Sequence, residues 1–184
     1  LSLQDTEKAQ YHPVRMWLDD VHDIMMSIYA RSNTYAMLYH IEHEMAQFGT
    51  AAALMLEDYN TGIWHKAFTC GTYCGGIDAR GRVSMFARRF SMTAAQLVAE
   101  FGYEHCSLAA QNSYNANDLI TRFDVEMLIM KNDKYDPDKL EMGNFPWQAV
   151  YYEKGTTEKF LRISGYNEQP FLMPRWHVTA GETY

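Results

Sequence analysis

The sequence contains 184 residues, of which 47 % are hydrophobic and 21 % are charged, and these proportions exclude an intrinsically disordered chain. Its length suits one domain with a buried core. The formal net charge of −7 at pH 7 offers no basic footprint for strong binding to nucleic acid. No apolar run is long enough to span a membrane as a helix, so we expect no membrane partner.

The first elements in chain order are two amphipathic helices. Pro13 stands at a favoured first helical position, and Gly49 supplies a stop for the second helix. Apolar residues recur at steps of three and four, which is the helical period; they are Val14, Trp17, Leu18, Val21, Ile24, Met25 and Ile28, then Met37, Leu38, Ile41, Met45 and Phe48. We therefore expect a helical hairpin from Pro13 to Phe48 that packs against a sheet with Trp17 buried.

The hydrophobic period then changes to that of β-strands. Residues 50–70 predict a strand, a turn at Asn60 to Gly62 and a second strand. Residues 73–92 predict another hairpin that turns at Asp78 to Gly81. Thr93 and Gln96 have the spacing of a capping box, which predicts a short helix that Gly102 closes.

The second half predicts further antiparallel strands. A short helix around residues 107–114 comes first, followed by an alternating strand at 122–131 and a polar loop at 132–144. Residues 145–155 and 158–166 resemble a hairpin, and the prolines after it favour an extended edge segment. The predicted fold class is α+β: an N-terminal helical hairpin packed on a mostly antiparallel β-sheet, with short inserted helices, in a single domain over residues 1–184.

One segment resembles a metal-binding motif. His43 and Glu44 begin the metalloprotease pattern His-Glu-x-x-His, but its fifth position is Gln47, so the second histidine ligand is missing. His40 and Glu44 could still share a helix face and hold a metal. The alternative, which we prefer, is a solvated polar face opposite the apolar stripe.

The cysteines and arginines give no catalytic arrangement either. Cys70 and Cys74 have no second pair to complete a zinc site, and Cys106 follows His105 directly, whereas helical neighbours point apart. An odd number of cysteines argues against a disulfide framework. Arg88 and Arg89 alternate with phenylalanines on a predicted strand, so at most one of them can join a given basic patch. We predict no catalytic residue, no cofactor site and no metal site.

Six sequence segments in series resemble the head-to-tail connecting (portal) proteins of short-tailed bacteriophages. They are FGTAAALMLED, ARGRV, RRFSMTAAQLVAEFG, FPWQAVYYEKG, SGYNEQPFLMPRW and the closing VTAGETY. The resemblance extends in order from about Val14 to Tyr184. The segments at 65–76 and 115–121 depart from the family pattern, which leaves these local loops open.

The resemblance implies a structural virion protein rather than an enzyme. Such portals are ring homo-oligomers of about a dozen copies at one capsid vertex, assembled in the bacterial host cytoplasm. They contact capsid and scaffold protein, the terminase motor and tail or adaptor proteins, and genomic DNA passes through their channel during packaging and ejection without sequence-specific binding. The alternatives are another phage structural or adaptor protein of similar fold, or a small metal-dependent hydrolase that uses His40, His43 and Glu44.

The resemblance also implies that the chain is an excerpt, truncated at both ends, of the wing region of a longer subunit. The closing segment from Phe171 to Tyr184 would then lie at the outgoing edge of the wing, laid against the preceding sheet. We expect Trp176 to be largely buried, Arg175 to point to solvent or pair with a carboxylate, and the chain to lose its contacts past Ala180.

Overall fold

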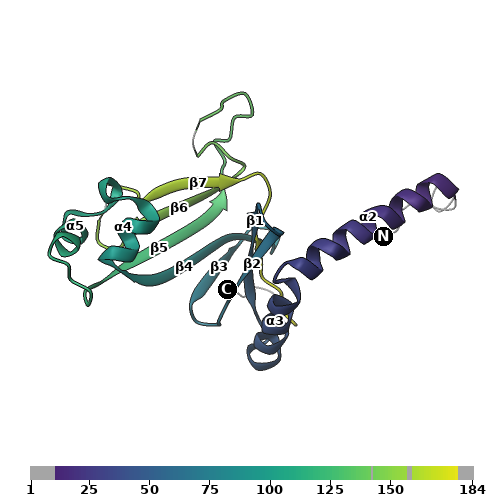
Figure 1. The fold of residues 1–184 in the computed structure, drawn as a ribbon, viewed down its shortest axis with the longest axis horizontal. Coiled ribbons are helices and arrows are strands. Elements are labelled where there is room, and N and C mark those ends of the chain that lie inside the picture. Colours follow the sequence, from purple (N-terminus) through teal and green to yellow (C-terminus); the bar gives the residue numbers. More distant parts are fainter. Residues whose placement is uncertain (1–10, 142, 157–158, 178–184) are drawn as a thin grey trace.

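The computed structural model describes residues 11–141, 143–156 and 159–177. Within them, the chain begins with two helices, α2 (His12–Arg31) and α3 (Thr34–Phe48), and continues as two antiparallel sheets with short helices inserted between β4 and β5 (Figure 1). The predicted α+β class is confirmed. None of the helices in the described ranges combines the length and apolarity needed to cross a membrane.

The smaller sheet has three strands in the order β2-β1-β8. Their bounds are β1 (Ala52–Asp58), β2 (Gly62–Phe68) and β8 (Phe171–Leu172). The first half of β1 is buried on both faces, which explains its continuous apolar run. Ala51 and Ala53 pack against α3, whereas Ala52 and Leu54 face the other sheet. The small alanine side chains let the helix approach the strand closely.

The larger sheet has five antiparallel strands in the order β3-β4-β5-β6-β7. They are β3 (Tyr73–Ile77), β4 (Val83–Thr93), β5 (Arg122–Lys131), β6 (Trp147–Glu153) and β7 (Arg162–Tyr166). Alternate residues of β5, namely Val125, Met127 and Ile129, are buried on one face, as the period of two predicts. This inner face carries the core.

The smaller sheet and a group of short helices cover different parts of that inner face. The smaller sheet packs over one part, where Phe86, Phe171 and Ile129 are almost completely buried. Over the other part lie α4 (Ala94–Phe101), the 3-10 turn η1 (Tyr103–His105) and α5 (Leu108–Asn115) (Figure 1). The predicted capping box of α4 is confirmed, since Gln96 N–H donates to Thr93 Oγ1 at 3.4 Å and Thr93 N–H donates to Gln96 Oε1 at 3.0 Å.

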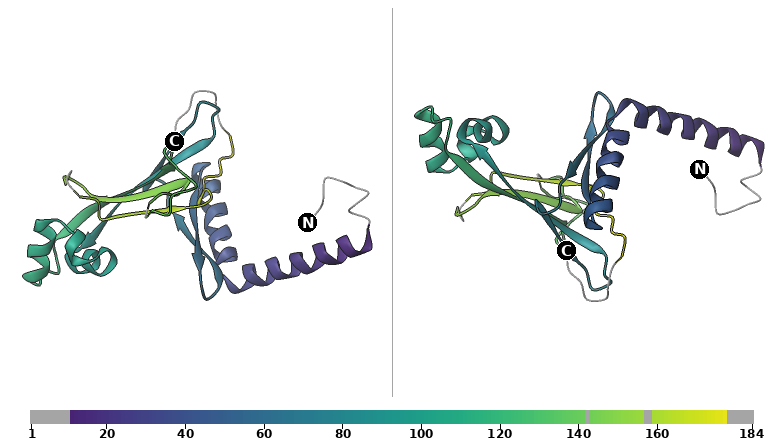
Figure 2. Two further views of the ribbon diagram at one scale, coloured as in Figure 1. Left: turned by 90° about the horizontal axis from the view of Figure 1, so that it is seen from above. Right: turned by 90° about the horizontal axis from the view of Figure 1, so that it is seen from below.

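The predicted helical hairpin is wrong in its packing. α3 packs against the smaller sheet through Met37 and Ile41, whereas α2 meets β2 only at its C-terminal end and otherwise extends away from the body as a projecting arm (Figures 1 and 2). No residue of α2 is buried, and Trp17 is 60 % exposed. The apolar periodicity predicted the helix correctly, but periodicity carries no information about which surface covers the stripe.

The C-terminal segment is laid against the smaller sheet, as predicted, through pairing of β8 with β1. The Pro170 carbonyl accepts a hydrogen bond from Met55 N–H at 2.7 Å, and the Pro174 carbonyl accepts one from Ala51 N–H at 3.2 Å. The prediction for Trp176 is wrong: its side chain is 71 % exposed. The expected loss of contacts past Ala180 falls outside the described residues.

Candidate functional site

In the part of the chain that the structure describes, no further metal ligand joins the histidine motif on α3. His40 and His43 are exposed, and His43 contacts Tyr39 and Gln47 rather than a second ligand. The Glu44 carboxylate instead accepts a hydrogen bond from the Cys70 N–H at 2.8 Å, which fixes the loop after β2. Within the described ranges, no group of three or more His, Cys, Asp or Glu side chains has the arrangement to hold a metal ion.

The three cysteines are free thiols in different surroundings. Cys74 is exposed, Cys70 is half-buried and Cys106 is buried. The Cys106 thiol donates to the Gly102 carbonyl at 3.2 Å, and burial, followed by the charge of Glu153, raises its pKa to about 11. Burial and the raised pKa are typical of a structural cysteine rather than a reactive one.

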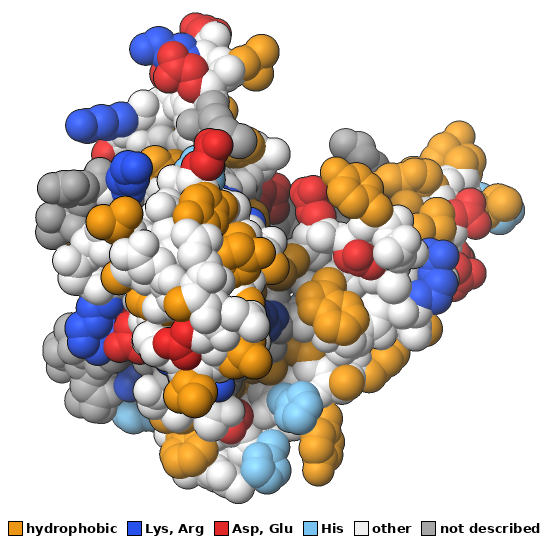
Figure 3. Space-filling view, turned by 60° about the vertical axis from the view of Figure 1, so that its left-hand side comes forward, with side chains coloured by type: hydrophobic (Ala, Val, Ile, Leu, Met, Phe, Trp, Pro, Cys, Tyr) orange, Lys and Arg blue, Asp and Glu red, His pale blue; other side chains and the backbone are white. Residues whose placement is uncertain are grey.

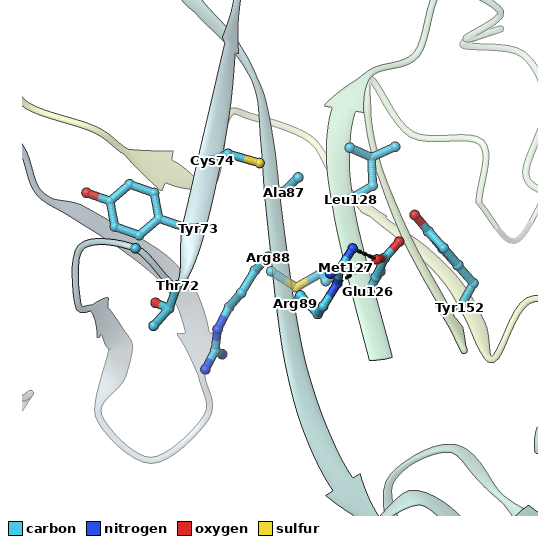
Figure 4. A pocket seen from close by; sticks show the side chains of 11 residues that line it. Thr72, Tyr73, Cys74, Ala87, Arg88, Arg89, Glu126, Met127, Leu128 and Tyr152 are labelled. Atoms are coloured by element: carbon cyan, nitrogen blue, oxygen red, sulfur yellow. Dashed lines mark hydrogen bonds and ion pairs between the residues drawn. The ribbon is translucent and has the colours of Figure 1, made fainter. Parts of the chain in front are cut away.

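Arg88 and Arg89 leave β4 toward opposite faces of the larger sheet, as the strand period predicts (Figure 4). Arg89 lies on the outer face beside Glu126 of β5, and its Nε donates to Glu126 Oε1 at 2.7 Å. Tyr152 of β6 is directly opposite Glu126 and also donates to it. The bond from Tyr152, then those from Arg89, lower the pKa of Glu126, and the same Tyr152 bond raises the pKa of Tyr152.

This outer-face row lines a shallow pocket of about 380 Å³ beside the start of β3 (Figure 4). Its cation and carboxylate already neutralise each other, so the pocket has no unpaired charge to offer from this pair. A combined basic groove of Arg80, Arg82, Arg88 and Arg89 is also excluded. Arg88 and Arg89 face opposite ways, and Arg82 is paired with Asp78 at 3.0 Å.

Arg88 borders this pocket as well, and it also lines a second cavity, a cleft of about 330 Å³ between the smaller sheet and α4. We call this cavity the inter-sheet cleft. Its lining residues come from both sheets and from α4; they are Leu54, Leu56, Lys66, Phe68, Arg88, Phe90, Met92, Glu100, Phe101, Met127, Tyr151, Arg162 and Tyr166. Arg88, Met127 and Tyr151 stand side by side across three strands, which places the guanidinium at the centre of the inner face.

Aromatic rings hold the two arginines of the inter-sheet cleft. The Arg88 guanidinium carbon lies 4.6 Å from the centroid of Phe68 and 5.0 Å from that of Phe90. Arg162 lies 5.0 Å from Phe101 and 4.9 Å from Tyr151. These cation–π contacts, together with partial burial, fix both side chains and limit their rotamer freedom.

The electrostatics of the cleft are unbalanced. Arg162 donates to the Glu100 carboxylate at 2.8 Å, whereas Lys66 and Arg88 form no salt bridge within the described ranges. Burial lowers the pKa of Arg88, and burial and then the charge of Arg88 lower the pKa of Lys66. Burial also raises the pKa of Tyr166 to about 12, so the phenol stays neutral. Three cations therefore face one carboxylate in a chain whose overall charge is negative.

Sequence reasoning missed this cleft because its cations come from three separate strands. Lys66 lies on β2, Arg88 on β4 and Arg162 on β7. The only available signal was the alternation of Phe86, Arg88 and Phe90, which places a charged residue on the apolar face of its strand. Charged side chains are seldom buried without a partner, so a charged residue on an apolar face can mark a binding site.

The fold is an α+β module from which the helix α2 projects, with none of its residues buried. The chain belongs to the family of bacteriophage head to tail connecting proteins, whose family model matches residues 1–184. The expected family is therefore confirmed.

Two phage proteins illustrate the relationship. The chain is 37 % identical over 172 residues to a protein of Bordetella phage BPP-1 described as a probable portal protein, a match that covers 93 % of this chain and 31 % of the relative. It is 34 % identical over 185 residues to the portal protein of Salmonella phage epsilon15, a match that covers 100 % of this chain and 33 % of the relative. The chain thus spans about a third of the length of these relatives.

Proposed function

We propose that this chain is part of the wing of a portal subunit, a structural component of the ring through which phage DNA is packaged and ejected. The family match over residues 1–184 carries this proposal, together with the similarity to two phage proteins that are described as portal proteins. In this role the chain catalyses no reaction. The ring would stand at one vertex of the virion, assemble in the host cytoplasm, and dock capsid, scaffold, motor and tail proteins.

The projecting helix supports an assembly role. α2 has 20 residues and none of them is buried, although its sequence carries an apolar stripe. Hydrophobic side chains are visible along this arm in Figure 3, and the exposed large ones on α2 are Met16, Trp17, Ile24 and Met26. Trp17 and Ile24 lie on the apolar stripe of α2, and large apolar side chains left exposed on a projecting helix are typical of a surface that another chain covers. In a ring, that chain is a neighbouring copy.

The net charge of −7 also supports a channel-forming subunit. Every contact between a phosphate and a basic side chain adds affinity, so a body past which DNA slides should present few unpaired cations to it. Arg82, in the turn before β4, and Arg89, on the outer face, are both paired with carboxylates. We therefore expect weak binding of duplex DNA, or none, at physiological salt.

The test is the assembly state of the full-length gene product, measured by mass photometry and seen by electron microscopy. We expect closed rings of about a dozen copies with a central channel. Replacing Trp17 and Ile24 together by serine should weaken the ring, whereas Tyr59→Ser, at a fully exposed position in the β1–β2 turn, should leave it unchanged. A full-length protein that stays monomeric at micromolar concentration would contradict the proposal.

The 184-residue chain by itself should form rings poorly, because the packing of a stem that helps to close the ring would lie outside it. Analytical ultracentrifugation of the short chain beside the full-length protein checks this point. A stable ring from the short chain would show that the wing carries assembly alone.

A further inference from the structure

The inter-sheet cleft contains a guanidinium that is held in place but lacks an acidic partner. The Nε atom of Arg88 is buried and has no hydrogen-bond partner in the part of the chain that the structure describes. Its faces contact Phe68 and Phe90, so its N–H edges are the groups left to bind a ligand. A buried donor without a partner destabilises the fold, and such groups usually have an acceptor in the functional state.

A second cation, Lys66, adds to the need for an anion in the cleft. Lys66 is close enough to Arg88 for the two charges to repel, which contributes to the lowered pKa of Lys66. The one carboxylate of the cleft, Glu100, is bonded to Arg162, and its charge offsets only part of the lowering of the Lys66 pKa. An added anion between Lys66 and Arg88 would relieve this repulsion. Partial burial strengthens such an interaction because water screens it less.

We propose that the inter-sheet cleft is a binding site for a carboxylate attached to an apolar group, with Arg88 and Lys66 as its anchors. A planar carboxylate matches the paired N–H edges of a guanidinium. The volume of about 330 Å³ suits a group of side-chain size. This inference is independent of the proposed portal role, since it depends only on the geometry of the cleft.

The lining of the cleft favours such a ligand over a free inorganic ion. Leu54, Leu56 and Met92 join the aromatic rings around the cations. These walls gain free energy by covering apolar atoms, whereas a strongly hydrated phosphate ion would lose its water without that gain. Duplex DNA is excluded on size, because the cavity lies between two layers of the fold and admits a single side chain rather than a backbone helix.

Three probes separate charge from shape. 3-Phenylpropionate carries a carboxylate on an aromatic group, 3-phenylpropionamide keeps the shape without the charge, and inorganic phosphate keeps the charge without the apolar part. Binding is followed by NMR through the Nε–Hε signals of the arginines and the backbone amides of β4. We expect 3-phenylpropionate to bind with a Kd of about 1 mM, which is typical of a small fragment, and to shift the Arg88 signal. The other two probes should bind at least roughly tenfold more weakly.

Substitutions then test which residues bind the carboxylate. Arg88→Gln should weaken the binding of 3-phenylpropionate by roughly tenfold or more, and Lys66→Gln by a smaller factor. Arg80→Gln is the matched control, because it removes the same charge at an exposed position in the turn before β4 and should change nothing. Lys66 is exposed, so its replacement leaves the fold intact even if the loss of Arg88 does not.

Three results would overturn the proposal. Equal binding of the amide would show an apolar cavity without a charge requirement, and binding of phosphate at least as tight would show a simple anion site. Unchanged binding of 3-phenylpropionate in both Arg88→Gln and Lys66→Gln would place the ligand elsewhere.

Discussion

Two hydrogen bonds join the side-chain amide of Asn33 to the backbone of His65. Asn33 Nδ2 donates to the His65 carbonyl at 2.6 Å, and the His65 N–H donates to Asn33 Oδ1 at 2.8 Å. The amide thus continues the hydrogen-bond pattern of a strand at the free edge of β2. Thr34 Oγ1 adds a bond of 3.0 Å to the His65 ring. The junction between α2 and α3 is therefore anchored to the sheet, and the projecting arm starts from a fixed point.

Asn33→Ala should lower the free energy of unfolding by about 1–3 kcal/mol, because it removes both bonds and leaves backbone groups of the half-buried edge without partners. Urea denaturation measures the change. Asn112→Ala on the exposed face of α5 is the control, and it should have an effect within about 0.5 kcal/mol. Equal effects of the two substitutions would mean that the amide bridge contributes nothing to stability.

His65 should make the stability of the chain depend on pH. Its ring is buried, and burial lowers its pKa below the ordinary value of 6.5. The unfolded chain therefore binds the proton more readily than the folded one. The contribution of neutral His65 to the free energy of unfolding is therefore fully present above about pH 6.5. It is lost as the pH falls from there toward the lowered pKa of the folded state.

The difference between wild type and His65→Gln isolates this effect from that of other titrating groups. The free energy of unfolding of the wild type should fall more steeply than that of the variant between about pH 7.5 and about pH 5.5. Parallel curves for the two proteins would show that His65 keeps an ordinary pKa in the folded state.

Phe86 is the centre of the core between the two sheets. It is fully buried, and its ring lies 5.4 Å from Phe68 and 5.8 Å from Phe171, which come from the other sheet. Phe86→Ala should cost about 3–5 kcal/mol through lost burial and the cavity that remains. Phe160→Ala, at a position that is 56 % exposed, should cost less than about 1 kcal/mol in the same urea experiment. A small cost for Phe86→Ala would mean that the sheets do not pack on each other in solution.

Much of the local structure could be predicted from the sequence. The alternation of residues 122–131 predicted the strand β5, and Thr93 with Gln96 predicted the start of α4, because both signals arise within one element. The partner surface of α2 could not be predicted. The stripe that contains Trp17 has the same period whether it packs on its own chain or on another.

The candidate site was unpredictable for a related reason. Which arginine of the Arg88–Arg89 pair faces the core depends on the strand register, and the charge balance of the cleft depends on where Lys66, Glu100 and Arg162 arrive from other elements. The pairing and register of strands that are distant in the sequence decide these positions. No local pattern in the sequence shows which strands will pair.

The apolar stripe of α2 predicted a buried Trp17, but the structure shows an exposed one, so the expected effect of replacing it is small. Trp17→Ala should change the free energy of unfolding of the isolated chain by less than about 1 kcal/mol, because the side chain is already largely in water. Urea denaturation followed by circular dichroism measures this. A loss of about 3 kcal/mol or more would show that α2 folds back onto the body in solution.

Cys106 should be the slowest of the three thiols to react. Its side chain is 2 % exposed, and the raised pKa of about 11 leaves very little thiolate at pH 8, whereas Cys74 is exposed. Ionisation alone predicts a rate with Ellman's reagent on the order of a hundredfold below that of a model thiol with a pKa of about 8.5, and burial lowers it further. The measurement compares a Cys70→Ser, Cys74→Ser double variant with a Cys70→Ser, Cys106→Ser double variant, each before and after urea unfolding. In urea the two rates should converge, because both the burial and the neighbouring Glu153 charge are lost. Rapid labelling of Cys106 in the folded chain would mean that α4 and α5 open readily from the sheet, and the helical cover of the inner face would then be a mobile part of the fold.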